Sequence, residues 1–251
     1  MKRSFYTLVF LFITLALVEA QPDSLYLRAN SLYQLGKYEE AIEVYDSIIF
    51  AGVESADLYY NMGNACFRSN KLGMARLFYE KALKINPRDE DVLANLNYLE
   101  TMLVDRFEEV PIIFYKKWIK SLVLSCNSNQ WAYISIISFI LCIISVLAYL
   151  FFRRIVFRKT GFYLGLIFLL FSLLSLAASW KQYHLIIKPD AAIVTDLSVN
   201  AKSAPHESGT VLFILHEGAK VWLDDNTADW REIRLSDGRK GWVPESSIQS
   251  I

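Results

Sequence analysis

Two uncharged apolar runs, separated by eight residues, constrain the fold of this 251-residue chain more than any other feature. The first run, WAYISIISFILCIISVLAYLFF, covers residues 131–152, and the second, GFYLGLIFLLFSLLSLAASW, covers residues 161–180. A helix rises 1.5 Å per residue, so the first run extends about 33 Å and can cross a hydrocarbon core of about 30 Å. Because backbone amides in lipid must be satisfied within the segment, we expect two transmembrane helices that form a hairpin.

The loop expected between the two spans, residues 153–160, indicates their orientation. It carries four basic residues, namely Arg153, Arg154, Arg158 and Lys159. Short basic loops stay in the cytoplasm, and Trp131 and Trp180 lie at the opposite ends, where tryptophan prefers the membrane interface. Three lysines at positions 116, 117 and 120 oppose this orientation. We give more weight to parity, since two spans leave both soluble parts on the same, outer side.

The N-terminal residues 1–20, MKRSFYTLVFLFITLALVEA, have the pattern of a secretory signal peptide. Lys2 and Arg3 precede a short apolar core, and the small residue Ala20 precedes Gln21. An uncleaved anchor is the alternative, and in both cases the chain after Gln21 leaves the cytoplasm. We therefore expect a protein of the cytoplasmic (inner) membrane with both soluble domains on the periplasmic side.

The linker before the first span, residues 105–130, contains an amphipathic stretch, IIFYKKWIKSLVL. Five apolar side chains fall on one helical face: Tyr115, Trp118, Ile119, Leu122 and Val123. The lysines fall on the other face. The stretch therefore either lies flat on the bilayer surface, with its charges on lipid phosphates, or is a plain linker helix.

A 34-residue repeat occupies the stretch 22–104. GKYEEAIEVYDSII at 36–49 aligns with NKLGMARLFYEKAL at 70–83, so that Ala41 and Ala75 occupy equivalent positions. This period, with small residues where two helices touch, is typical of tetratricopeptide repeats. The chain resembles that family over two repeats, at about 22–55 and 56–89, followed by a capping helix at 90–104. The resemblance implies an all-α stack of antiparallel helix pairs.

In the tetratricopeptide family, the first helix of each pair lines a concave groove that binds proteins. We expect this groove to display Tyr26, Asn30, Tyr33, Tyr60, Asn64, Phe67 and Arg68. Asn30 and Asn64 would bond an extended peptide backbone, and the aromatic residues would provide apolar anchors. Alternatively, several of these aromatic residues pack only against the capping helix or the membrane-proximal segment. In relatives that clamp a C-terminal carboxylate, lysines project beside those asparagines. This chain has Tyr26 there and has Asp91 and Asn95 at the later basic positions, so we do not expect a carboxylate clamp.

The C-terminal residues 188–251 consist of short alternating stretches divided by turn signals, which predicts β-strands. Gly238, in the turn SDGR, is suited to the positive φ of a hairpin. The segment resembles the bacterial SH3 family in LSVNAKSAP, HEGAKVWL and DGRKGWV, although Asn200 and Ala201 stand before Lys202 where members usually carry an arginine. The resemblance implies a small all-β barrel that binds peptides or cell-wall glycopeptides. Its candidate contacts are Trp222, Asp224, Trp230 and Trp242, of which Trp242 fits the core better.

The sequence contains no recognisable arrangement for catalysis. The three histidines have no metal-ligand spacing, and we find no phosphate-binding loop or nucleophile elbow. A Cys66–Cys126 disulfide is disfavoured because Cys66 should face the repeat core. The chain has 26 basic and 26 acidic residues, which gives no reason to expect nucleic acid as a partner. We predict a protein that is not an enzyme and that has no cofactor or metal.

The complete order of segments predicts a multidomain membrane protein with an all-α tetratricopeptide domain, two transmembrane helices and a C-terminal all-β SH3-like barrel. This order resembles the BatE-type proteins of the Bacteroides aerotolerance operon. The resemblance implies partners among the sister Bat proteins with von Willebrand A domains, and a role in an envelope complex linked to oxidative stress. From the residues alone we expect a membrane-anchored scaffold with two external binding modules. The alternative is a tether or sensor that binds peptidoglycan through the SH3-like domain.

Overall fold

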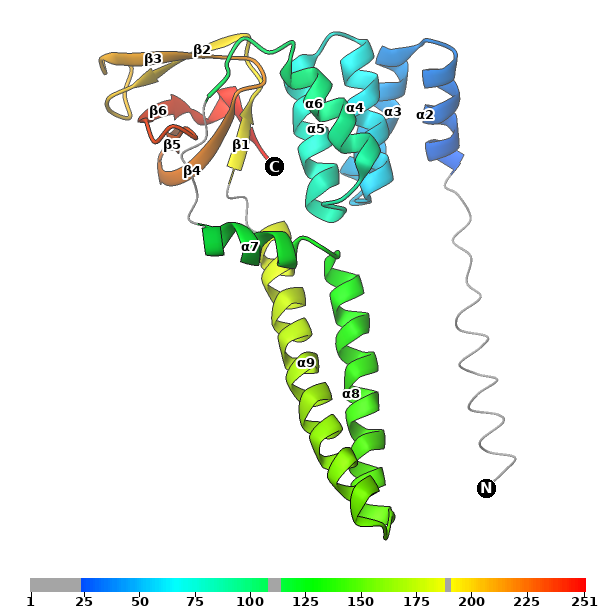
Figure 1. Cartoon of the computed structure of the whole chain (residues 1–251). Helices are drawn as coiled ribbons and strands as arrows, with labels where there is room; N and C mark the ends of the chain where they lie inside the picture. Colours follow the sequence, from blue (N-terminus) through cyan, green and yellow to red (C-terminus); the bar gives the residue numbers. More distant parts are fainter. Residues whose placement is uncertain (1–23, 108–113, 188–190) are drawn as a thin grey trace.

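In the described part of the chain, five helices, the short helix α7, a long helical hairpin and an antiparallel sheet follow one another (Figure 1). The computed structural model describes residues 24–107, 114–187 and 191–251. The expected signal segment, residues 1–20, lies outside these ranges. The predicted class is confirmed: the chain has an N-terminal helical repeat region, two long apolar helices and a C-terminal all-β domain.

The repeat region consists of two helix pairs and one further helix. Their bounds are α2 Ser24–Gln34, α3 Tyr38–Phe50, α4 Ala56–Arg68, α5 Leu72–Ile85 and α6 Glu90–Glu100. The tight turn inside each pair needs a left-handed residue, and Gly36 (φ 77°) and Asn70 (φ 59°) provide it 34 positions apart. Ser55 begins α4 and Asp89 begins α6 by accepting hydrogen bonds from backbone N–H groups.

Close packing inside the second pair depends on the absence of a side chain at Gly63. A Cβ atom there would lie 2.7 Å from the ring of Tyr79. Ala41 and Ala75 are fully buried at equivalent positions of α3 and α5. The repeat period therefore corresponds to a repeated contact between helices.

The two apolar helices are α8, Ser128–Phe151, and α9, Ile155–Ile187. Both are long and apolar enough to cross a bilayer. The segment expected as a loop, residues 153–160, is mostly helical, because α9 begins at Ile155 and only residues 152–154 interrupt the hairpin. The guanidinium of Arg158 lies over the Tyr149 ring, 5.2 Å from its centroid, so one of these basic residues packs against the end of α8.

Serines recur every seven residues along the contact between α8 and α9. Ser135 Oγ donates to the Ser172 carbonyl and Ser172 Oγ donates to the Ser135 carbonyl, each at 3.0 Å. Seven residues earlier in α8 and seven residues later in α9, Ser128 and Ser179 make the same reciprocal pair, at 3.2 and 2.9 Å. Near the other end, a Cβ on Gly161 would lie 2.8 Å from the Ser145 carbonyl. Small residues thus let the two backbones approach closely enough for each serine hydroxyl to reach a carbonyl of the other helix.

Helix α7, Phe114–Val123, crosses the upper ends of α8 and α9 (Figure 1). The indole N–H of Trp131 donates to the Val123 carbonyl at 2.9 Å and fastens the end of α7 to the start of α8. Val123 is buried, whereas Trp118 is 71% exposed and Leu122 is also exposed. An exposed apolar face at the ends of two apolar helices is the arrangement that a helix on the bilayer surface requires.

The C-terminal domain is a seven-stranded antiparallel sheet in the order β3-β2-β6-β5-β4-β1-β7. The strands are β1 Ala191–Val194, β2 Ser198–Lys202, β3 Val211–His216, β4 Lys220–Thr227, β5 Trp230–Arg234, β6 Lys240–Pro244 and β7 Ile248–Ser250. Its core holds Val194, Leu215 and Ile233, all of them fully buried. Gly238 takes a φ of 93° in the turn between β5 and β6. The assignment to the bacterial SH3 family stays a prediction.

Candidate functional site

The predicted groove residues lie on the first helices of the two pairs. Helix α2 carries Tyr26, Asn30 and Tyr33, and helix α4 carries Tyr60, Asn64, Phe67 and Arg68. A hollow of about 280 Å³ opens between these helices and is lined by Asn30, Tyr33, Gln34, Tyr45, Asn61 and Asn64. The structure therefore brings residues of both repeats together around one concave space.

Side-chain hydrogen bonds connect the first repeat to the second. Asn30 Oδ1 accepts from the Tyr45 hydroxyl at 2.6 Å and from Asn61 Nδ2 at 3.2 Å. Asn61 Nδ2 also donates to the Tyr26 hydroxyl at 2.7 Å. Each of these four side chains therefore has a partner on a different helix.

The same cluster recurs 34 residues later, where it connects the second repeat to α6. Asn64 Oδ1 accepts from the Tyr79 hydroxyl at 2.7 Å and from Asn95 Nδ2 at 2.9 Å. Asn95 Nδ2 also lies 3.3 Å from the Tyr60 hydroxyl. The carboxamide oxygens of Asn30 and Asn64 thus already accept hydrogen bonds within the repeats. A ligand in the groove would therefore contact the N–H groups of these asparagines.

In these clusters the hydroxyls of Tyr45 and Tyr79 donate hydrogen bonds, whereas those of Tyr26 and Tyr60 accept them. Burial raises the pKa of Tyr45 and of Tyr79 far above the usual value of 10.0. Burial also raises the pKa of Tyr26, and the nearby Asp57 carboxylate raises it further. The phenols of Tyr26, Tyr45 and Tyr79 therefore stay protonated at neutral pH and keep their hydrogen bonds.

The remaining groove aromatics are half-buried, and Arg68 beside them is exposed. Phe67 makes an edge contact with Tyr98 of α6 at a centroid separation of 5.9 Å, as expected if it packs against the capping helix. Arg68 lies 5.0 Å over the ring of Tyr38, which in turn meets Tyr33 edge-on. The groove therefore has an aromatic rim with one cation on it.

The four candidates in the sheet do not form one site. Asp224 pairs with Lys240 and Arg234, and the hydrogen bond from Lys240 is the main cause that lowers its pKa. Lys202 lies 5.1 Å over the Trp230 ring. Trp242 is half-buried between the buried Gly241 and Val243 of β6.

Trp242 consequently lies on the face of the sheet opposite the core, because side chains alternate along a strand. The expectation that Trp242 packs in the core is wrong. Trp222, unlike the other three candidates, lines a pocket between the sheet and the repeat helices.

The sheet is docked directly on the repeat helices, which sequence reasoning missed. Glu217 Oε1 accepts from the Gly73 backbone N–H at 2.7 Å, and Lys220 Nζ lies 2.7 Å from Glu80 Oε2. Their partners are 144 and 140 residues apart in sequence. No local or periodic pattern connects such distant positions.

The segment after α6 adds a second line of contacts to the sheet. Asp105 accepts from the His216 backbone N–H at 2.6 Å and lies 3.0 Å from its Nδ1. A Cβ on Gly218 would lie 2.6 Å from Leu103, so the two segments touch closely there. The two soluble modules are therefore in contact through both α5 and the chain that leaves α6.

Comparison with known proteins identifies the helical part. The tetratricopeptide repeat family model matches residues 26–90. Residues 26–90 are a tetratricopeptide repeat region. A search of curated proteins found no match for the chain. Such repeats typically bind proteins and are rarely catalytic, so the chain has a protein-interaction module.

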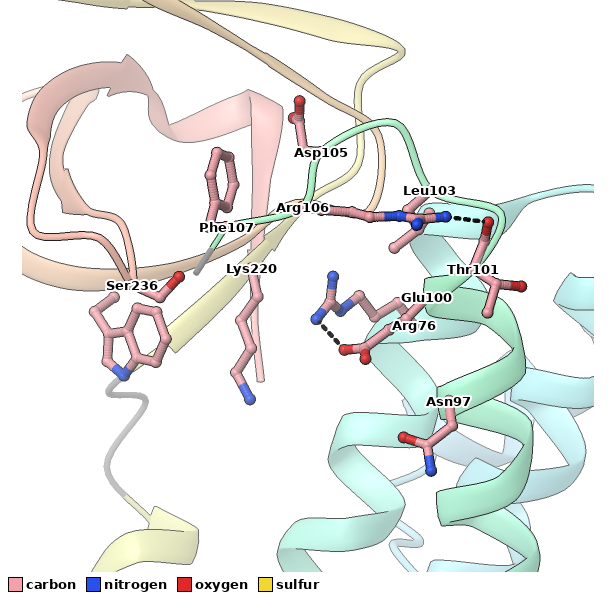
Figure 2. A pocket seen from close by; sticks show the side chains of 11 residues that line it. Arg76, Asn97, Glu100, Thr101, Leu103, Asp105, Arg106, Phe107, Lys220 and Ser236 are labelled. Carbon is pink, nitrogen blue, oxygen red and sulfur yellow. Dashed lines mark hydrogen bonds and ion pairs between the residues drawn. The ribbon is translucent and has the colours of Figure 1, made fainter. Parts of the chain in front are cut away.

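The pocket between the tetratricopeptide repeat region and the sheet has a volume of about 470 Å³ (Figure 2). Helices α5 and α6 supply Arg76, Asn97 and Glu100; the following segment supplies Thr101, Leu103, Asp105, Arg106 and Phe107; and the sheet side supplies Lys220, Trp222 and Ser236. Pockets of this size form preferentially where two domains meet. The pocket exists only because the two modules are docked.

Proposed function

We propose that this protein is a non-catalytic, membrane-anchored scaffold that binds a protein partner in the groove of its tetratricopeptide repeat region. The observation that carries the proposal is the hollow of about 280 Å³ on α2 and α4, which has polar N–H groups within an aromatic rim. The sheet docks through α5, a helix that does not line this hollow. Both soluble modules can therefore stay docked while the groove binds a partner.

The anchor in this proposal is the helical hairpin of α8 and α9. Both soluble modules join the same end of this hairpin, because one precedes α8 and the other follows α9 (Figure 1). Their direct contacts require that they share one side of the membrane. We place this side in the periplasm on the basis of the basic residues around position 156, with α7 on the bilayer surface.

The proposed partner is another envelope protein anchored in the same membrane. The resemblance to BatE-type proteins supports a von Willebrand A-domain Bat protein and a role in aerotolerance or oxidative stress. A binding surface held next to the membrane meets such a partner at high effective concentration.

Crosslinking in intact cells tests the proposed function. A photoreactive residue at position 34, which is exposed and lines the hollow, should capture a specific membrane protein that mass spectrometry identifies. The matched control is position 43, which is exposed on α3 and faces away from the lining residues. Equal capture at both positions, or capture at neither, would refute groove binding.

A peptidoglycan tether is the second candidate, and one observation favours it. Trp230 and Trp242 lie on the solvent side of the sheet, beside Lys202, where they can stack on a sugar or a peptide. If this candidate is correct, detergent-solubilised full-length protein should sediment with purified cell wall, and Trp230→Ala should abolish the sedimentation. Unchanged sedimentation of the Trp230→Ala variant would exclude this role for the sheet.

A further inference from the structure

The pocket between the two modules contains three cations whose hydrogen-bonding capacity is only partly used. Arg76 donates through Nη1 to the Gly218 carbonyl at 2.8 Å and through Nη2 to Glu100 at 2.7 Å. Its Nε is buried and has no hydrogen-bond partner among the described residues. A buried donor without a partner is unfavourable, so an acceptor placed there by a ligand would be favoured.

The other two cations lie on different walls of the same pocket. Arg106 donates to the Thr101 carbonyl at 2.6 Å and is otherwise exposed. Lys220 pairs with Glu80 from the sheet side. Figure 2 shows the Arg76 and Lys220 side chains entering the space between the helices and the sheet, with Arg106 above them. Guanidinium and ammonium groups have several donors each, so all three can accept a further partner.

The acidic residues of the pocket are already occupied. Glu100 accepts from Arg76, and both oxygens of Asp105 face His216. These two carboxylates would repel a ligand with two negative charges, such as a phosphate monoester. A single carboxylate fits the remaining donors better, because a guanidinium matches its planar geometry.

An apolar wall lies beside the three cations. It consists of Leu103, Phe107 and Trp222. Phe107 also packs against the core of the sheet, so its position is fixed by the docked arrangement. A ligand in this pocket would therefore place an apolar or aromatic side chain on this wall and a carboxylate next to it.

We propose that the pocket binds a peptide carboxylate that is flanked by an apolar side chain. The inference rests on the proposed function, in that the ligand is a segment of a protein partner. Two sources have this chemistry, namely the C-terminus of a chain and an internal acidic residue next to an aromatic one. The site is separate from the groove and contains residues of both modules. It can therefore bind a second segment of the partner only while the modules are docked.

Fluorescence polarisation with the full-length protein in detergent micelles tests this proposal. The probes are three fluorescein-labelled tetrapeptides: Gly-Gly-Ala-Phe with a free C-terminal carboxylate, the same peptide amidated, and amidated Gly-Gly-Glu-Phe. The free acid or the glutamate peptide should bind at least about tenfold more tightly than the uncharged amide. Preference for the free acid identifies a chain end, and preference for the glutamate peptide identifies an internal acidic residue.

Variants locate the binding. Arg106→Gln should weaken binding of the preferred peptide about tenfold, and Trp222→Ala should weaken it as well. Arg88→Gln, a change of another exposed arginine in the repeat region, is the matched control and should leave binding unchanged. Hydrogen exchange of the repeat and sheet amides verifies that the Arg106→Gln protein keeps its fold.

Three results would overturn the proposal: no binding of any peptide at about 1 mM, equal binding of all three, or equal effects of Arg106→Gln and Arg88→Gln. The failure is distinguishable from that of the proposed function, because crosslinking from position 34 reports on the groove and does not involve Arg106. Specific crosslinking from position 34 without carboxylate binding would support the proposed scaffold function and refute only the proposed carboxylate site.

Discussion

The tetratricopeptide repeat region and the helical hairpin use opposite distributions of polarity. The repeat region buries large side chains, including Tyr45, Leu58, Met62, Leu77 and Tyr79. The hairpin buries serines, namely Ser135, Ser138, Ser145, Ser172, Ser175 and Ser179, and exposes isoleucine, leucine and phenylalanine along most of its length. The repeats are therefore arranged for water and the hairpin for lipid.

The two regions also share a feature, namely polar contacts between helices that recur at a fixed spacing. The repeats are connected by an Asn–Tyr–Asn cluster that recurs every 34 residues, and the hairpin is connected by Ser–Ser pairs that recur every seven. In water, apolar burial supplies most of the stability and the polar cluster defines the register. In lipid, apolar side chains gain little by leaving the solvent, so packing of small residues and hydrogen bonds hold the helices together.

The largest effect should follow removal of a buried ring from the repeats. Tyr79→Ala should lower the free energy of unfolding of the repeat region by about 3–5 kcal/mol, because it opens a cavity and also removes the hydroxyl that donates to Asn64. Hydrogen exchange of the repeat amides in the full-length protein measures this loss. Leu166→Ala, a truncation on the exposed face of α9, is the contrast and should leave the hairpin amides as protected as before. Similar losses in both variants would contradict the assignment of different solvents.

Alkaline pH should destabilise the repeat region next most strongly. Burial raises the pKa of Cys66 from 9.0 to about 12 and that of Tyr59 from 10.0 to about 12. Folding raises the pKa of both groups. Their contribution to the free energy of unfolding is therefore fully present below pH 9 and is lost as the pH rises toward 12. Thermal unfolding followed by helical circular dichroism should show a decline across this range.

Tyr59→Phe sharpens the pH prediction. The variant removes one ionisable phenol and keeps the ring, so its stability should decline less steeply above pH 10 than that of the natural chain. A decline that begins below pH 8 would show that other groups dominate.

A single polar substitution in the repeats should have an intermediate effect. Asn64→Ala leaves the Tyr79 hydroxyl buried without its acceptor and should lower the free energy of unfolding by about 1–3 kcal/mol. The equivalent Asn30→Ala should behave alike, since Asn30 holds Tyr45 in the same way. Hydrogen exchange near α4 and α6 is the readout, and an unchanged rate in both variants would show that the clusters are not structural.

The smallest effect should come from the hairpin. Ser135→Ala removes one member of a reciprocal pair and should weaken the α8–α9 contact by about 0.6 kcal/mol, the average for such hydrogen bonds in membranes. Spin-label distances between the two helices in lipid should therefore stay unchanged. Gly161→Leu is the positive control, since a side chain there meets the backbone of α8. Separation of the helices by Ser135→Ala alone would show that the serines matter more than packing.

The sequence predicted the classes of the three parts because each has its own period or composition. The 34-residue period placed Tyr26, Asn30 and Tyr33 on one helix and their equivalents on another. The same period also relates Asn61 to Asn95 and Tyr45 to Tyr79, so the hydrogen-bonded clusters were open to detection. The seven-residue serine pattern was equally visible within the spans.

The docking of the two modules was beyond sequence reasoning. Glu217 meets Gly73, and Asp105 meets His216, across more than a hundred intervening residues. Such contacts depend on the shapes of two folded surfaces, and neither residue type signals a partner. The pocket inherits this difficulty, because only Trp222 among its lining residues stood out in the sequence.

Chemical labelling in intact spheroplasts tests the central claim, that two docked modules are held on the outer side of the membrane by one helical hairpin. Single cysteines are placed at exposed positions 34, 156 and 226 after the three natural cysteines are replaced. A membrane-impermeant thiol reagent should label positions 34 and 226 in intact spheroplasts and should reach position 156 only after lysis. Labelling of 156 with protection of 34 would invert the orientation, and protection of only one of 34 and 226 would contradict the docked arrangement itself.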